Sequence, residues 1–492
     1  MENGFHLVTY SIPATHLHPL RHLHRPSTFS LKGLLQSLAL VCLAAWWMSA
    51  CTPRDEEFTP DAGALLQFEA DTVTFDTIFT EASSVTKRLK VYNRSKNAVR
   101  ISEIKVGQLS ASPFQVIVNG QAGPQLQNIE VRGGDSLLVL VTANLKSTSA
   151  QGPFLVNESL LFLTNGNQQE VKLVAYGQNA TYYRNATAGC AEVWTAAKAH
   201  VIYDSVTVPV GCTLTIAKGA QVYLHNKAKL KVLGMLRVEG EPEQRVVFQQ
   251  VRQEERYRNA PGQWHGLEFA GASQNNQIRY AEIKNAMTGV YLKAEGNNVP
   301  QVTLRQVFVK NMLQHGVLSH GGNVRLENTL IANCAEYALA GLGGGRYEVV
   351  YSTLANYSYD FLRVTPSFLF QEKLETGGKL VREAKYVVEV VNSILWGRQE
   401  EELKFDDAKL GSTRTVRYSF LKTKAYQTEF TGNGNQINVD PKFRDDPKLD
   451  FQIIKLSPAN KAATPLAGIT VDYENKARDA ATPDVGAIEV HD

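Results

Sequence analysis

The chain has 492 residues, and its 51 Lys and Arg residues nearly balance its 48 Asp and Glu residues, giving a net charge of +3. This balance lacks the basic excess of a nucleic-acid-binding protein, so we expect no nucleic-acid partner. The length is sufficient for two or three hydrophobic cores.

The first predicted element is an export signal, residues 1–50. An apolar run of 17 residues, 34–50, follows three basic residues and ends at Cys51. Its length is at the low edge of what spans a bilayer, which favours a cleaved signal over a signal-anchor helix. The junction Met48-Ser49-Ala50-Cys51 resembles a bacterial lipobox, whose cysteine is diacylated at sulfur and becomes the mature N-terminus. We therefore expect Cys51 to be lipidated and the lipid to be the membrane contact.

A short acidic tether, 51–59, follows the lipidation site. Asp55, Glu56 and Glu57 lie within it, and they resemble the surface-export tag of Bacteroidetes lipoproteins. The alternative is a solvated tether that carries no export signal, since flexible termini are commonly acidic. The resemblance implies an outer-membrane lipoprotein that faces the cell surface.

The next segment, 60–178, is predicted to be a β-sandwich. Short runs such as 86–92 and 137–141 alternate apolar and polar residues, and turn residues such as 93–97 separate them. This pattern is typical of strands with one packed and one solvated face. The segment resembles the immunoglobulin-like domains that precede solenoids in Bacteroidetes lipoproteins, which implies a spacer or an interaction platform.

A linker is expected at 179–199, and beyond it the repeat length changes. Four asparagines that each follow an aliphatic residue by two places are separated by 26, 22 and 23 residues: Asn285, Asn311, Asn333 and Asn356. That spacing is near one coil of a parallel β-helix, in which stacked coils bury a continuous core. We interpret the asparagines as a structural ladder at a recurring corner, because Asn tolerates left-handed backbone and its amide can bond to the next coil. The alternative is a row of amides that lines a glycan groove.

The flanking sequence supports the same architecture for 200–439. Residues 212–220 resemble the entry coils of right-handed parallel β-helix proteins, and 440–492, with Pro483-Asp484-Val485-Gly486, resembles the terminal coil and cap of that family. The predicted fold is therefore all-β, with an immunoglobulin-like sandwich followed by a pectate-lyase-like right-handed parallel β-helix. The fold alone does not select an activity.

The cysteines that follow the lipobox leave two alternatives open. Cys190, Cys212 and Cys334 are an odd set in an oxidising compartment,. A bridge between Cys190 and Cys212 is one interpretation, and three buried thiols are the other.

Candidate catalytic residues are sparse along the coils. A lyase would need acids that converge on Ca²⁺ and a basic residue that takes the proton, and the coils offer Arg305 and Lys310 without matched aspartates,. A hydrolase would need paired carboxylates, and His315 and His320, each beside a glycine, supply only part of such a site,. We expect no metal or other cofactor, with Ca²⁺ implied only for a lyase.

The repeat is delayed between Leu362 and Tyr386, so the insertion 363–385 is the preferred place for ligand or partner contacts,. We interpret the protein as a non-catalytic module that binds a glycan or an envelope protein. The alternatives are a β-helix polysaccharide lyase or glycoside hydrolase, and an adhesin.

Overall fold

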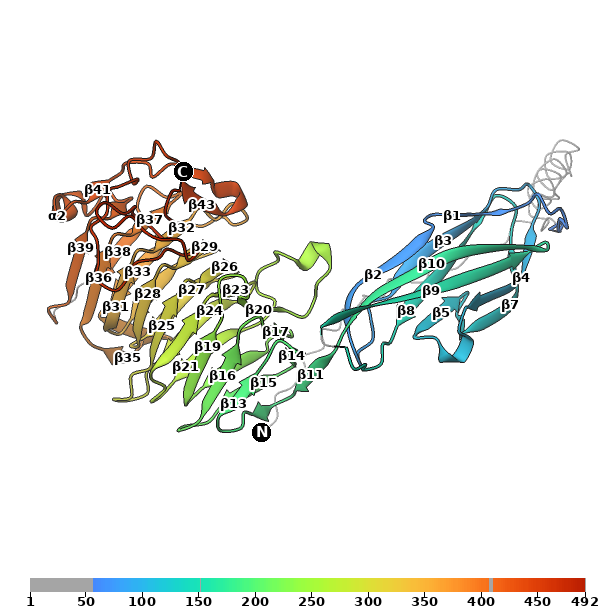
Figure 1. The fold of residues 1–492 in the computed structure, drawn as a ribbon, viewed down its shortest axis with the longest axis horizontal. Coiled ribbons are helices and arrows are strands. Elements are labelled where there is room, and N and C mark those ends of the chain that lie inside the picture. Colours follow the sequence, from blue (N-terminus) through green and yellow to red (C-terminus); the bar gives the residue numbers. More distant parts are fainter. Residues whose placement is uncertain (1–55, 151, 407–409, 492) are drawn as a thin grey trace, which may run out of the picture. The chain divides into compact units, whose positions relative to one another are not determined.

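The computed structural model describes residues 56–150, 152–406 and 410–491, which form a β-sandwich followed by a β-helix (Figure 1). The export signal and Cys51 lie outside the described residues. Within the part of the chain that is described, no helix has the length and apolar character needed to cross a membrane.

The sandwich consists of two five-stranded sheets. Its strands alternate buried and exposed side chains, so each sheet contributes one face to a shared core that includes Phe75, Leu89, Val139 and Phe162. Neighbouring strands are antiparallel except for the parallel pair β2 and β10. One sheet has the order β1 (Leu66–Phe68), β3 (Lys87–Asn93), β8 (Ser136–Ala143), β5 (Phe114–Val118) and β6 (Gln121–Gly123); the other has the order β2 (Thr72–Phe79), β10 (Asn167–Gln178), β9 (Pro153–Thr164), β4 (Val99–Val106) and β7 (Gln125–Val131). A 3₁₀ turn, η2 (Leu109–Ala111), precedes β5.

The β-helix is built from three long parallel sheets, to which each coil contributes one strand in turn. Sheet I contains β11 (Ala180–Tyr183), β14 (Ala199–Ile202), β17 (Gln221–Leu224), β20 (Val246–Gln250), β23 (Ala281–Lys284), β26 (Phe308–Met312), β29 (Leu330–Cys334), β32 (Thr353–Asn356), β37 (Ile394–Gly397), β40 (Phe420–Leu421) and β41 (Gln436–Ile437). Sheet II contains β12 (Ala186–Thr187), β15 (Ser205–Val208), β18 (Lys229–Val232), β21 (Gly266–Ala270), β24 (Thr288–Lys293), β27 (His315–His320), β30 (Leu339–Leu342), β33 (Phe368–Gln371) and β38 (Leu403–Asp406). Sheet III contains β13 (Glu192–Trp194), β16 (Thr213–Ala217), β19 (Met235–Glu239), β22 (Asn276–Arg279), β25 (Gln301–Arg305), β28 (Asn323–Glu327), β31 (Gly345–Val350), β36 (Tyr386–Val391) and β39 (Thr413–Arg417).

Stacks of identical apolar positions fill the interior of the β-helix. One such stack on sheet I places one aliphatic or aromatic side chain from each coil directly above the last, and every member is at most 2% exposed: Val222, Phe248, Ile283, Val309, Ile331, Leu354, Leu395 and Leu421. Because parallel strands lie about 4.8 Å apart, each side chain covers the one below it. The fold class predicted from the sequence, a sandwich followed by a parallel β-helix, is confirmed.

Two kinds of corner turn the chain between sheets. Asn285 follows β23, and Asn311 and Asn333 lie near the ends of β26 and β29, where the chain leaves sheet I; their φ angles are 66°, 59° and 53°. Asn356, at the end of β32, does not share this left-handed backbone. The corner between sheets III and I also uses left-handed residues in successive coils, including Tyr280 and Gln306 with φ of 43° and 50°. The type of residue at this second corner varies from coil to coil, so the corner leaves no repeat in the sequence. The left-handed backbone is nevertheless the same at each coil.

The first coil includes the segment that we expected to be a linker, 179–199. Strands β11, β12 and β13 within it pair with the second coil. A disulfide joins Cys190 to Cys212 of the next coil, whereas Cys334 is a buried free thiol. The rings of Trp194 and His200 stack in parallel at 4.7 Å near this end of the core.

The C-terminal end of the β-helix is closed by a short helix, α2 (Gln427–Phe430), whose Phe430 is buried in the core. The segment 440–491, called the cap below, then packs on the outer face of sheet I. It contains β42 (Phe443–Asp445), η4 (Asp446–Lys448) and β43 (Asp450–Ile453). Its apolar residues Phe451 and Ile488 contact Leu330 and Ala355 of sheet I.

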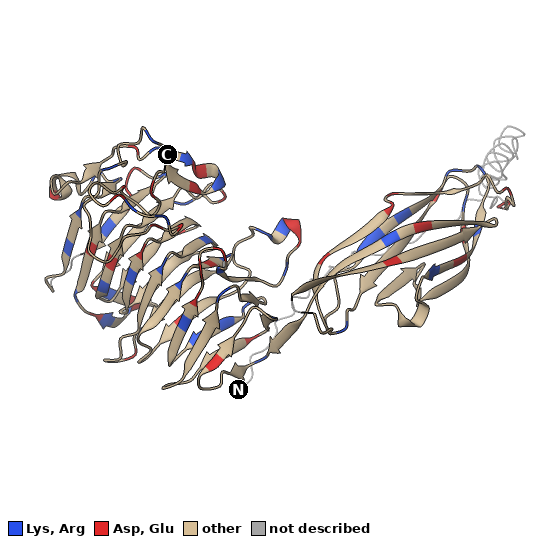
Figure 2. Ribbon diagram, in the orientation of Figure 1, with Lys and Arg blue, Asp and Glu red and all other residues tan. Residues whose placement is uncertain are grey.

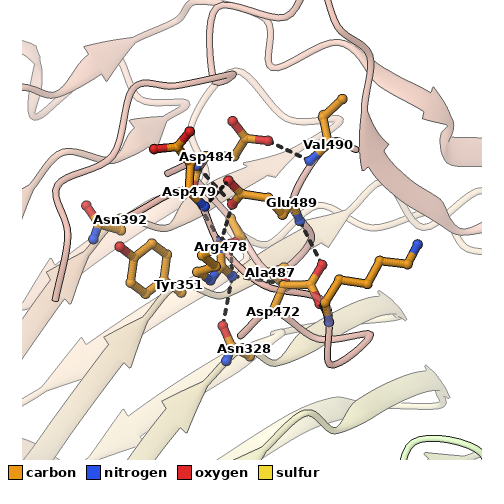
Figure 3. A network of polar contacts seen from close by, with 12 residues as sticks. Asn328, Tyr351, Asn392, Asp472, Arg478, Asp479, Asp484, Ala487, Glu489 and Val490 are labelled. Carbon is orange, nitrogen blue, oxygen red and sulfur yellow. Dashed lines mark hydrogen bonds and ion pairs between the residues drawn. The ribbon is translucent and has the colours of Figure 1, made fainter. Parts of the chain in front are cut away.

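A polar network centred on Arg478 holds the cap (Figure 3). The guanidinium group donates to Asn328 Oδ1 of the β-helix at 2.8 Å and pairs with Glu489 Oε2 at 3.1 Å. It lies 4.1 Å from the ring centre of Tyr351, and the Glu489 backbone amide donates to the buried Asp472 carboxylate. Arg478 thus connects the cap to Asn328 and Tyr351 of the coils.

Candidate binding cleft

The outer face of sheet I changes from apolar to polar where the cap ends. Along one register, Glu282 is followed by Phe308, Leu330, Thr353, Ile394 and Phe420 in successive coils; along the neighbouring register, Lys284 and Lys310 are followed by Ala332, Ala355 and Trp396. The apolar members are buried beneath the cap. The polar members on β23 and β26 lie at the edge of the cap, where Tyr473 packs against Phe308 and Tyr280 donates to Asn475, and they stay only partly buried. Charged side chains are costly to cover without partners.

A cleft of about 570 Å³ lies at this boundary. Its floor is β26 and the start of the next corner, one wall is the corner loop after β32, and another is the edge of the cap. Asn259 comes from the loop 251–263, which contains the 3₁₀ turn η3 (Glu255–Tyr257). The lining residues are Asn259, Phe308, Lys310, Asn311, Asn333, Tyr359, Asp360, Pro447, Lys448 and Leu449.

Ion pairs compensate the charges of the floor. Glu282 lies 3.1 Å from the Lys310 ammonium group and 3.5 Å from that of Lys284. Burial alone would raise the pKa of Glu282, but the two ammonium groups outweigh burial and hold this pKa below its usual value,. Glu282 is therefore a fixed carboxylate that orients Lys310 at the cleft.

The asparagine corner reaches the cleft through Asn333. Its Nδ2 donates to Asn311 Oδ1 of the preceding coil and to Asp360 Oδ2, each at 2.8 Å. Asn285 instead donates to Gln250 Oε1, and Asn356 Oδ1 accepts the backbone amide of Cys334. Amides at this corner thus join neighbouring coils, and one of them also positions an exposed carboxylate.

The wall that carries Tyr359 and Asp360 is fixed by a buried ion pair. Arg363 and Glu402 have side-chain exposures of 1% and 0%, and both guanidinium Nη atoms bond to the carboxylate, at 2.7 and 2.8 Å. Arg363 also donates to the Asn356 carbonyl at the start of the loop. Glu402 additionally accepts the backbone amides of Ser367 and Gln399. The loop 357–367 is therefore held at both ends.

The aromatic ring of Tyr359 is exposed but has a fixed orientation. It stacks parallel to Tyr357, with an interplanar angle of 8°, and its hydroxyl donates to Asp446 of the cap. Tyr359 is 48% exposed, so one part of the ring surface is available at the wall of the cleft.

The weak catalytic candidates from the sequence do not converge. Arg305 lies on sheet III and pairs with Glu327 at 3.4 Å. Lys310 lies on sheet I, and His315 and His320 lie on sheet II. Successive strands of one coil face different directions, so residues close in sequence are separated onto three faces.

The two histidines have mainly structural contacts. His320 Nδ1 lies 2.9 Å from the Tyr291 hydroxyl, and His315 stacks on Tyr337. Burial lowers the pKa of His315 to about 4 and also lowers that of His320,. Both rings are therefore neutral near pH 7, and neither lines the cleft.

The insertion 363–385 separates into two structures. Its first part completes the wall loop, and after β33 a hairpin of β34 (Lys373–Thr376) and β35 (Lys379–Glu383) follows. Arg382 fastens this hairpin by donating to the carbonyls of Gly343 and Gly296. Tyr359 and Asp360, which line the cleft, immediately precede the insertion; the only sequence signal for them is the delayed repeat itself.

Charges are interspersed over the β-helix rather than gathered by sign (Figure 2). Among the described residues, no group of three or more His, Cys, Asp or Glu side chains is arranged to hold a metal ion. Burial outweighs the opposing contacts and raises the pKa of Asp484 and that of Glu489, and both groups belong to the cap network rather than the cleft.

No protein-family model matches the sequence, and no curated protein matches it significantly. Among solved structures, the catalytic unit of a GH87 α-1,3-glucanase from Streptomyces thermodiastaticus aligns with 68% of this chain and 84% of its own, at 12% identity and a TM-score of 0.26. A protein of unknown function from Porphyromonas gingivalis aligns with 25% of this chain and 59% of its own, at 12% identity and a TM-score of 0.18. The PapD-like domain 7 of human CEP192 aligns with 26% of this chain and 94% of its own, at 12% identity and a TM-score of 0.16. Similarity at this level carries no argument about activity.

Proposed function

We propose that this protein is an outer-membrane lipoprotein, exposed at the cell surface, whose β-helix binds a glycan in the cleft between β26 and the cap without cleaving it. The observation that carries this proposal is the cleft at which polar positions of sheet I meet the edge of the cap. There a concave surface offers amide, ammonium, carboxylate and aromatic groups side by side. Such a mixture, held on a rigid scaffold, is suited to a ligand rich in hydroxyl groups.

The absence of catalysis is supported by the state of the acidic groups. Glycoside hydrolysis uses one carboxyl as an acid and a second as a base or nucleophile across the bond. In the cleft, Asp360 accepts from Asn333, and the nearby Glu282 is held ionised by two lysines. Arg305 and the two histidines, which a catalytic account would need, lie on other sheets.

The binding proposal is tested with residues 52–492 and a panel of polysaccharides, followed by affinity electrophoresis and by chromatography of product size. Lys310→Trp fills the cleft from its floor, and Lys231→Trp adds the same bulk to the outer face of sheet II. We expect retardation that Lys310→Trp abolishes and Lys231→Trp retains, with unchanged polymer size. Shortened products would establish an enzyme instead, and equal retardation of both variants would place binding elsewhere.

The location is a separate part of the proposal and rests on the lipobox-like junction and the acidic tether. Cys51→Ala should abolish incorporation of labelled fatty acid and partition into detergent. Protease added to intact cells should digest the wild-type protein. Protection until the outer membrane is broken would place the protein on the periplasmic face.

A further inference from the structure

We infer that the glycan bound in this cleft is uncharged, and that Asp360 and Tyr359 are the residues that select it. The inference rests on the proposed function and specifies its ligand class. It follows from which groups of the cleft already have partners and which remain available.

The two lysines that line the cleft each lie beside a carboxylate of the protein, although Lys310 shares its partner Glu282 with Lys284. Lys310 pairs with Glu282 at 3.1 Å, and Lys448 pairs with Asp445 at 2.7 Å. A polyuronate or a sulfated chain would have to compete with these carboxylates for each ammonium group. The cleft therefore lacks the surplus of positive charge that anionic chains require.

Asp360 is in the opposite situation. Its carboxylate accepts one hydrogen bond, from Asn333 Nδ2, and no ion pair joins it to a cation within the described residues. It is exposed at the wall of the cleft. An ionised carboxylate accepts several hydrogen bonds, so Asp360 can accept from two neighbouring hydroxyl groups of a sugar but would repel a uronate.

Tyr359 supplies the apolar part of the contact. Because Asp446 holds its hydroxyl and Tyr357 holds its ring, the aromatic face is oriented before a ligand arrives. A preorganised ring loses little conformational entropy on binding, and it can pack against the C–H face of a pyranose. A neutral sugar can therefore donate its hydroxyl groups to Asp360 while its apolar face packs on Tyr359.

The test is calorimetric titration of residues 52–492 with soluble neutral polysaccharides (an α-glucan, a β-glucan and a mannan) and with polygalacturonate, each at 0.05 and 0.5 M NaCl. We expect a neutral polysaccharide to bind with an affinity that changes less than about twofold with salt. Asp360→Ala should weaken it about tenfold or more, because a hydrogen bond to a charged group is lost. Tyr359→Ala should weaken it about fivefold.

Matched controls remove the same groups elsewhere. Asp204→Ala removes an exposed acid at a corner of an early coil, and Tyr176→Ala removes a tyrosine of the sandwich that is 47% exposed. Both should bind as the wild type does. Tighter, salt-sensitive binding of polygalacturonate would overturn the inference and leave the proposed function standing. No binding by any member of the panel would overturn both.

Discussion

The buried pair of Arg363 and Glu402 gives the sharpest prediction, because the wall of the cleft depends on it. Replacing Glu402 with Ala leaves a guanidinium group without its carboxylate at a position where 1% of the side chain is exposed. The change also removes the acceptor of the Ser367 and Gln399 backbone amides. Breaking one partner of a buried pair costs about 3–5 kcal/mol, so we expect a loss of that size in the free energy of unfolding.

The assay is urea unfolding of residues 52–492 followed by tryptophan fluorescence. Trp194, Trp264 and Trp396 are the tryptophans of this segment, and all lie on strands or corners of the β-helix, so the signal reports that region rather than the sandwich. The double variant Arg363→Met with Glu402→Met should be more stable than Glu402→Ala, since no unpaired charge remains. Glu400→Ala, which removes the acid of the exposed pair with Lys424, should leave the midpoint unchanged,.

Two results would refute this reasoning. If Glu402→Ala lowers stability by less than about 1 kcal/mol, the pair is not the anchor of the loop. If the double variant is less stable than Glu402→Ala, then the hydrogen bonds that Arg363 donates to the loop outweigh the penalty of its unpaired charge.

Three further predictions concern the coils. Reducing the Cys190–Cys212 bridge should lower the free energy of unfolding by about 3 kcal/mol, measured by urea titration with and without dithiothreitol, and an unchanged midpoint would contradict this,. The pKa of His315 lies below its ordinary 6.5, at about 4, so its neutral form contributes stability above pH 6.5 that is lost as pH falls toward 4,. His315→Gln should flatten this part of the stability profile, measured by urea unfolding at a series of pH values, and an unchanged profile would contradict this. Asn311→Leu removes the acceptor of the Asn333 amide and should lower the melting temperature by a few degrees,; a wild-type melting temperature would show that the amide contact does not stabilise the coils.

Much of the fold follows from local patterns. The alternation of apolar and polar residues in 86–92 and 137–141 predicts the sandwich strands, and the spacing of the four asparagines predicts the coil length. Both patterns reflect geometry that is repeated along the chain. The corner between sheets III and I was not predicted, since residues as different as Tyr280 and Gln306 meet the same left-handed requirement. The strands within 180–194 are too short for alternation to reveal them.

The cleft could not be predicted from the sequence for a different reason. Asn259, Lys310, Asp360 and Lys448 belong to four separate segments, and only the folded cap brings the last of them against the first three. The sequence does show that the outer positions of sheet I become apolar after Lys310, at Ala332 and Ala355. That change becomes informative once the strand register is known, because it marks where the cap ends.

Hydrogen–deuterium exchange of residues 52–492, with and without a saturating neutral polysaccharide, tests the central claim most directly. The account predicts that the ligand slows exchange in three segments that meet at the cleft, 308–312, 357–361 and 446–450, while exchange in the hairpin 373–383 and in the sandwich is unchanged. Protection confined to the hairpin, to the outer face of sheet II or to the sandwich would contradict the assignment of the cleft as the binding site.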